Sequence, residues 1–243
     1  MRKQLFWDHY FKISELSEFG NEGVPEKLEK YNTEKDMLKR HYSLANIPEK
    51  YFSFEFETIK TKLKETDNAE SIAKIEKYFG SLDKAAKKGI GLYLCGEHGV
   101  AKTTIATIIL KKAIAEDFRC FFAKSTEIVE FARSGWKNED RKVFFDYIVN
   151  TVDFFVIDDV ARLSEVTDAE KIHTDKIFTK RDDLNLVTIM TANHIMDKNK
   201  SLFGEGLFSN FKERMIPVEL FGDDYRNTIG DSLLDKLDGS KNR

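Results

Sequence analysis

The residues with the clearest chemical pattern lie at positions 91–104, where an apolar run leads through glycines into Lys102 and Thr103. An apolar strand, a glycine-containing loop, a Lys-Thr pair and a helix, in this order, are typical of a P-loop. In such a loop, backbone amides and the following helix N-terminus bind phosphate oxygens. We expect the Lys102 ammonium to reach the β- and γ-phosphates of ATP, and the Thr103 hydroxyl to ligate Mg²⁺. The residues expected to line the phosphates are Gly96, Glu97, His98, Gly99, Val100, Ala101, Lys102, Thr103 and Thr104.

The loop departs from the usual pattern at one position, because Ala101 stands where a glycine normally precedes the lysine. Alanine keeps the backbone amide that binds phosphate, but its methyl group hinders a backbone with positive φ. The pattern alone therefore leaves two interpretations open. One is a phosphate-binding loop, and the other is a tight strand-to-helix turn without a ligand.

A second apolar run, over residues 151–157, ends in two carboxylates, Asp158 and Asp159. Parallel sheets bind their ligands at the carboxyl ends of the strands, which is where these side chains would lie. We expect Asp158 to hold the Mg²⁺ shell, as a Walker B aspartate does, and Asp159 to position or deprotonate the attacking water. The alternative is that Asp158 pairs with a lysine and Asp159 caps the next turn.

Two further polar residues follow the same logic. Asn193 comes after a third apolar run, 186–191, and could orient the attacking water near the γ-phosphate; the alternative is an asparagine that starts a turn. Arg214 ends the helical stretch 207–215. Its planar guanidinium suits phosphate charge on a neighbouring chain, and a surface ion pair is the alternative.

The elements that must position these residues follow from the periodicity of the sequence. From residue 89 onward, apolar runs of strand length alternate with helical segments, which predicts an α/β fold with a parallel sheet covered on both faces. The region before it is small, aromatic and highly charged. The expected strands are 91–95, 119–123, 152–157, 186–191 and 216–221, and the expected helices are 5–19, about 70–86, 102–115, 125–133, 139–150 and 167–182.

Composition excludes several classes of protein. The 243 residues contain 39 Lys and Arg against 42 Asp and Glu, a net charge of −3 that argues against a polybasic binder. Two cysteines, Cys95 and Cys120, cannot build a zinc framework or a disulfide scaffold, and buried free thiols fit a reducing, cytoplasmic compartment. No apolar run approaches the roughly 18 residues of a membrane-spanning helix.

Taken in order, these motifs resemble those of AAA+ ATPases of the DnaC/DnaI/IstB type, which are helicase loaders and transposition helpers. The resemblance begins at the segment 45–51 and extends to residue 228. It implies a P-loop AAA+ sheet flanked by helices, with a small helical N-terminal region and no separate lid domain. It also places Arg214 at the arginine finger and makes Arg226, in the run Asp-Tyr-Arg, a sensor-2-like contact to the nucleotide.

The resemblance implies a mechanism and a domain plan. ATP with Mg²⁺ would bind at the interfaces of a homo-oligomer, with Lys102, Asp158 and Asn193 from one protomer and Arg214 from the next. Residues 1–60 would bind a partner, residues 61–228 would form the ATPase core, and residues 229–243 would form a tail. The partner would be a ring-shaped replicative helicase of the DnaB type, placed on single-stranded DNA during initiation.

Two surfaces are candidates for those contacts. Four N-terminal aromatics could grip the helicase, or could pack on the ATPase core: Phe6, Trp7, Tyr10 and Phe11. A basic cluster beside an aromatic could contact single-stranded DNA, although a solvated helix face is the alternative. That cluster consists of Arg133, Trp136, Lys137, Arg141 and Lys142.

Three other functions remain open on the sequence. The first is an IstB-like helper of a transposase, with the same ATPase and a different partner. The second is a nucleotide-binding clamp with little hydrolysis, suggested by Ala101 and the short Asp159 side chain. The third is a small-molecule P-loop kinase, which would need a lid with several arginines, and none cluster after the third strand.

Overall fold

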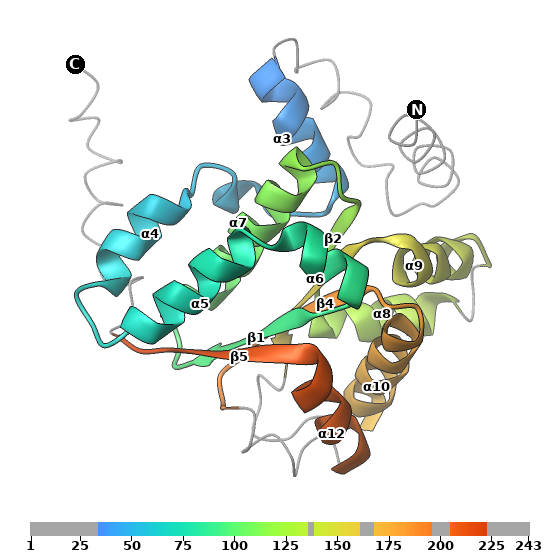
Figure 1. Cartoon of the computed structure of the whole chain (residues 1–243). Helices are drawn as coiled ribbons and strands as arrows, with labels where there is room; N and C mark the ends of the chain where they lie inside the picture. Colours follow the sequence, from blue (N-terminus) through green and yellow to red (C-terminus); the bar gives the residue numbers. More distant parts are fainter. Residues whose placement is uncertain (1–33, 136–138, 161–167, 196–204, 223–243) are drawn as a thin grey trace, which may run out of the picture.

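The structure is a computed structural model, and it describes residues 34–135, 139–160, 168–195 and 205–222. Five parallel strands form one sheet in the order β2-β3-β4-β1-β5. Parallel strands need crossover connections, and helices supply them here. The expected α/β architecture is confirmed (Figure 1). The strands are β1 (Gly91–Gly96), β2 (Cys120–Lys124), β3 (Phe154–Val160), β4 (Val187–Ala192) and β5 (Met215–Leu220).

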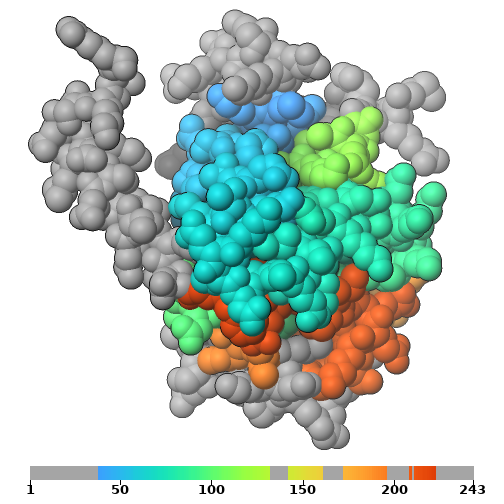
Figure 2. All heavy atoms as spheres, turned by 60° about the vertical axis from the view of Figure 1, so that its left-hand side comes forward, coloured from blue at the N-terminus to red at the C-terminus, as the bar shows by residue number. Residues whose placement is uncertain are grey.

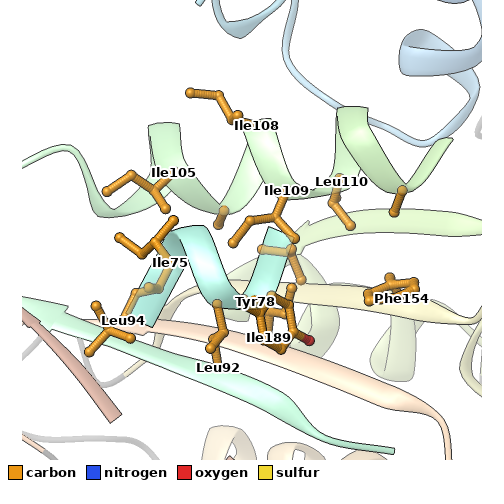
Figure 3. Close-up of a cluster of buried hydrophobic side chains, with 14 of the residues drawn as sticks. Ile75, Tyr78, Leu92, Leu94, Ile105, Ile108, Ile109, Leu110, Phe154 and Ile189 are labelled. Carbon is orange, nitrogen blue, oxygen red and sulfur yellow. The ribbon is translucent and has the colours of Figure 1, made fainter. Parts of the chain in front are cut away.

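One face of the sheet is covered by a helical layer centred on α7. Figure 3 shows how α7 isoleucines such as Ile105 and Ile109 lie over Leu92 and Leu94 of β1 and Ile189 of β4. All five of these side chains are buried to 5% exposure or less, which is why the strands read as continuous apolar runs. The layer comprises α3 (Glu34–Leu44), η1 (Glu49–Tyr51), α4 (Phe56–Leu63), α5 (Ala69–Phe79), α6 (Leu82–Lys88) and α7 (Lys102–Ala115).

The other face carries a second core. Tyr93 and Phe155 point to this side because side chains alternate along a strand. Phe178 and Phe211 add an edge-to-face ring pair with centroids 4.6 Å apart between two of the covering helices. These helices are α8 (Ser125–Gly135), α9 (Glu139–Thr151), α10 (Asp168–Asp183) and α12 (Glu205–Arg214).

A buried arginine fixes the amino ends of the central strands. Arg181 is fully buried, and its guanidinium donates to the carbonyls of Val149 (2.9 Å) and Val187 (2.6 Å) and to the Thr188 hydroxyl (3.1 Å). Burial lowers the pKa of Arg181 to about 9. Neutral acceptors therefore satisfy a charge that would be costly to bury unpaired.

The segment that leads into the core is tied to the sheet. Ala45 and Ile47 belong to the first core, and the Phe122 N–H of β2 donates to the Ala45 carbonyl at 2.9 Å. The Asn46 side-chain amide donates to the Phe122 carbonyl at 2.9 Å. In Figure 2, α3 in blue and α4 and α5 in cyan and teal form a continuous surface above β5. The domain boundary at residue 60 stays a prediction.

The helix expected over about 70–86 is two helices, α5 and α6, which are separated at Gly80 and Ser81. Gly80 caps α5, and its N–H donates to the Glu76 carbonyl at 3.1 Å. Within the described ranges, no helix is long and apolar enough to cross a membrane. The helix expected at 5–19 lies outside the described residues.

Candidate nucleotide-binding site

The loop between β1 and α7 has the backbone of a phosphate-binding turn. Gly96 and Gly99 both have positive φ, at 143° and 82°. A Cβ on Gly96 would lie 2.1 Å from the Leu220 carbonyl oxygen of β5, so only glycine fits where β1 ends. The loop then turns into α7, whose N-terminus faces the same end of the sheet.

Ala101 adopts the left-handed conformation that glycine would normally supply. Its φ is 67° and its ψ is 16°, and it is the N-cap of α7, with its carbonyl accepting from the Ile105 N–H at 2.9 Å. A non-glycine residue in this region costs roughly 1–2 kcal/mol. The chain therefore reaches the glycine conformation with alanine, at the cost of local strain.

The Lys102 side chain lies across the loop. It is 8% exposed, and its Nζ donates to the carbonyls of Gly96 at 2.8 Å and Glu97 at 2.5 Å. An ammonium group in this place can exchange loop carbonyls for phosphate oxygens without leaving the loop. This is the position that the sequence predicts for a residue that binds the β- and γ-phosphates.

Asp158 receives two hydroxyl hydrogen bonds on one oxygen. Thr103 Oγ1 of α7 donates to Asp158 Oδ1 at 2.8 Å, and Thr191 Oγ1 of β4 donates to the same atom at 2.6 Å. The residue is 5% exposed, and burial raises the pKa of its carboxyl group, while the two hydroxyl bonds lower it. The charge of Lys124, which pairs with Asp158 across β2 and β3, also lowers this pKa, so a lysine contributes beside the two hydroxyl groups.

The Thr103–Asp158 pair fits a magnesium site. Both are hard oxygen ligands, which Mg²⁺ prefers, and Mg²⁺ usually takes its other ligands from phosphates and water. Among the described residues, no group of three or more His, Cys, Asp or Glu side chains could hold a metal by itself. This donor set therefore suits a metal that arrives with a nucleotide.

Asp159 lies at an irregularity of the sheet. The pairing of β3 with β4 shifts register between Ile157 and Val160, and Asp159 has a φ of 62°. Its N–H donates to Thr191 Oγ1 at 2.8 Å, and its carbonyl accepts from Ser125 Oγ at 3.1 Å. Bulges of this kind re-aim a side chain next to a functional site.

The side-chain amide of Asn193 is a buried hydrogen-bond donor that is not satisfied among the described residues. Its Nδ2 is buried and has no hydrogen-bond partner in the described part of the chain. Buried amides are nearly always paired, and an orphan one needs an explanation. A ligand at the carboxyl edge of the sheet, beside Asp158, would provide the missing acceptor.

Arg214 lies at the amino ends of the strands, opposite the end that carries the P-loop. It precedes Met215, which pairs with Gly91 at the amino end of β1, whereas the P-loop follows the carboxyl end. Its Nε lies 2.6 Å from Asp182 Oδ1, and its Nη1 donates to the Lys88 carbonyl at 3.0 Å. Arg214 therefore cannot serve the P-loop of its own chain, and the isolated chain shows the ion pair. The finger role in a neighbour stays a prediction.

Several predicted residues cannot be placed in the site. Arg226, the four N-terminal aromatics, Trp136 and Lys137 lie outside the described residues, and the side chains of Arg133 and Arg141 are not described either. Lys142 is exposed on α9.

Two site residues, Thr191 and Ser125, escaped prediction. The signal was present, because each is a hydroxyl residue at or just after the carboxyl end of a strand, where the ligand edge lies. What the sequence lacks is the strand order that brings both to β3.

Of three comparisons with known proteins, the one with solved structures finds similar folds. No model of a known protein family matches the chain, and no curated protein matches it in sequence. Among solved structures, the DnaC helicase loader matches with a TM-score of 0.57 and 20% identity, over 63% of this chain and 89% of that one. DnaI matches with a TM-score of 0.58 and 17% identity, over 72% and 94%.

A third similar structure is AMPPCP-bound DnaA from Aquifex aeolicus, with a TM-score of 0.53 and 17% identity, over 69% of this chain. The match spans 51% of the length of that DnaA chain. The chain thus shares the fold of the DnaC and DnaI structures, a parallel sheet flanked by helices, which confirms the fold expected from its motifs.

Proposed function

We propose that this chain is an ATPase that loads a ring-shaped replicative helicase onto single-stranded DNA. The observation that carries the nucleotide part is the cluster at the carboxyl edge of the sheet. There, Lys102 spans the loop, Thr103 bonds Asp158, and the Asn193 amide has a buried donor without a partner. The loader part is supported by the likeness to DnaC and DnaI.

Each residue of the cluster has a distinct task in the proposed reaction. The amides of the loop 96–101 and the N-terminus of α7 bind the phosphates, and Lys102 offsets the charge that develops on them. Thr103 and Asp158 would hold Mg²⁺, which would neutralise part of the phosphate charge when bound.

The attacking water would be handled from two neighbouring strands. Asp159 of β3 would accept its proton or fix its direction, and Asn193 after β4 would donate its free N–H to the water or to the γ-phosphate. Arg214 would act from the adjacent protomer, where its charge would stabilise the transition state. This is consistent with its place at the edge opposite its own loop.

Ala101 favours a second function, a nucleotide-dependent clamp with slow turnover. Alanine with a φ of 67° lies directly before Lys102, and its Cβ limits how far the loop backbone can move during turnover. The two functions differ in turnover rather than in binding. Single-turnover hydrolysis of ATP by the assembled protein separates them, since a clamp would hold ATP without cleaving it.

The partner is the second part of the proposal, and a capture experiment tests it. The full chain, with and without ATP, is mixed with a purified replicative helicase or with a transposase. Loading predicts capture of the helicase, loss of capture in a variant with Phe6→Ala and Trp7→Ala, and ATP-dependent transfer to single-stranded DNA. Capture of the transposase alone would instead support the transposition-helper alternative.

The remaining details of the proposal are the compartment and the assembly. Both cysteines are free and buried, and burial raises the pKa of the Cys120 thiol, as suits an inert thiol in a reducing cytoplasm. Homo-oligomers would form when nucleotide and partner are present, because Arg214 needs a neighbouring site.

A further inference from the structure

We infer that Thr191 and Ser125 are positioning residues, whose hydroxyl groups clamp the backbone of Asp159 from the two sides of β3. The inference rests on the proposed function, since it assigns roles around the same nucleotide site. It concerns two residues that the sequence motifs do not mark.

The clamp follows from the strand order. β3 lies between β2 and β4. Ser125 directly follows β2, and its Oγ donates to the Asp159 carbonyl at 3.1 Å, while Thr191 of β4 accepts from the Asp159 N–H at 2.8 Å. Both polar groups of the Asp159 backbone are therefore held, one by β4 and the other by the first residue of α8, which directly follows β2. Thr191 is 1% exposed and Ser125 is 3% exposed, so water does not compete freely for either bond.

The clamp matters because Asp159 departs from strand geometry. In a regular strand, Asp158 and Asp159 would point to opposite faces of the sheet. The φ of 62° at Asp159 and the register shift after Ile157 break this alternation. A conformation outside the β region persists only when its surroundings fix it. The two hydroxyl groups contribute to fixing it here.

Thr191 also joins the two aspartates to each other. Its single hydroxyl accepts from the Asp159 N–H and donates to Asp158 Oδ1 at 2.6 Å. A hydroxyl that does both has a defined direction, from the backbone of Asp159 to the carboxylate of Asp158. Thr191 thereby orients the carboxylate that would hold Mg²⁺, and it does so in the way that second-layer groups orient metal ligands. The Ser125 hydroxyl donates to the Asp159 carbonyl.

This division of labour predicts two different defects. Removing the Thr191 hydroxyl should weaken the response to Mg²⁺ and slow hydrolysis. Removing the Ser125 hydroxyl should slow hydrolysis and leave the response to Mg²⁺ unchanged. The matched control is Thr188, a buried threonine three residues earlier on β4, whose hydroxyl accepts from Arg181 Nε at the far end of the strand.

The experiment uses the full chain and four variants, Thr191→Val, Thr191→Ser, Ser125→Ala and Thr188→Val. Binding of AMPPCP is titrated by calorimetry with EDTA and at a series of Mg²⁺ concentrations. Turnover of ATP is measured at saturating Mg²⁺, and thermal melting reports folding. Thr191→Val should bind AMPPCP in EDTA as wild type does, and need about tenfold more Mg²⁺ for half-maximal tightening. It should also lose kcat with little change in KM.

The other variants complete the test. Thr191→Ser should restore the Mg²⁺ response. Thr188→Val should lower the melting temperature and leave the Mg²⁺ response unchanged. A wild-type Mg²⁺ response in Thr191→Val, or an equal loss in Thr188→Val, would overturn the inference. If Thr191→Val does not fold, full turnover in Ser125→Ala overturns the clamp. A wild-type chain that binds no nucleotide would overturn the proposed function, and the inference with it.

Discussion

Replacing Ala101 with glycine tests whether the phosphate loop is strained before ligand arrives. Ala101 has a φ of 67° in the ligand-free chain, where a non-glycine residue costs roughly 1–2 kcal/mol. Glycine removes that cost but adds about 0.4–1 kcal/mol of unfolded-state entropy. The net gain in the free energy of unfolding should be about 0.5–1 kcal/mol, which corresponds to a rise of about 1–4 °C in melting temperature for a chain of this size.

The nucleotide affinity should behave differently from the stability. We expect the loop to keep this backbone when nucleotide binds, so the strain should be present before and after binding and should cancel. The dissociation constant of the Ala101→Gly variant should therefore stay within about twofold of wild type, whereas strain created only on binding would improve it roughly tenfold per 1.4 kcal/mol.

The measurements are thermal melting and calorimetric titration with AMPPCP. Ala73→Gly is the matched control, because Ala73 is exposed in the middle of α5 and glycine there should cost about 1 kcal/mol. The two substitutions are chemically identical and should shift the melting temperature in opposite directions. A fall in the melting temperature of Ala101→Gly, or a tenfold gain in affinity, would refute the reasoning.

Three further predictions concern the charged residues. Arg214→Ala should leave ATP binding intact and impair hydrolysis only in the assembled state. Asp182→Ala, which breaks the same 2.6 Å ion pair, should keep turnover. Equal turnover losses in the two variants would show that Arg214 has only a structural role. Asp158→Asn should be more stable than wild type at pH 7 without nucleotide, and should lose Mg²⁺-dependent binding; chemical denaturation checks the first part. The sign follows because burial raises the folded-state pKa of Asp158, so the native state binds the proton more tightly, and stability falls as pH rises from the unfolded to the folded pKa. The free energy of unfolding of the wild-type chain should therefore fall as pH rises across that acidic window, and that of Asp158→Asn should fall less. Identical slopes of unfolding free energy against pH in the two chains would contradict the raised pKa of Asp158.

The sequence predicts the sheet well because three of its strands, β1, β3 and β4, are buried almost throughout. Residues 154–157 of β3, for example, are all apolar and all buried, and no surface pattern competes with that signal. The P-loop residues and the two aspartates were found for a related reason. They directly follow such runs, and in a parallel sheet the ends of the runs meet at one edge.

What the sequence does not predict depends on contacts between distant segments. Thr191 and Ser125 reach Asp159 only because β2, β3 and β4 are neighbours in the sheet, and no local pattern encodes that order. The left-handed backbone of Ala101 is set by the tight turn into α7 rather than by the residue itself. Arg214 bonds to Asp182 of α10 and to the carbonyl of Lys88, the last residue of α6, and both are far from it in the sequence.

The measurement that tests the central claim most directly is calorimetric titration of the wild-type chain and of Lys102→Ala with ATP and Mg²⁺. Wild type should bind one nucleotide per chain. The variant loses a charge-assisted contact worth about 1.5–3 kcal/mol, so its affinity should fall about 10- to 150-fold. Equal binding by both chains, or none by wild type, would contradict the assignment of the strand ends as a nucleotide site.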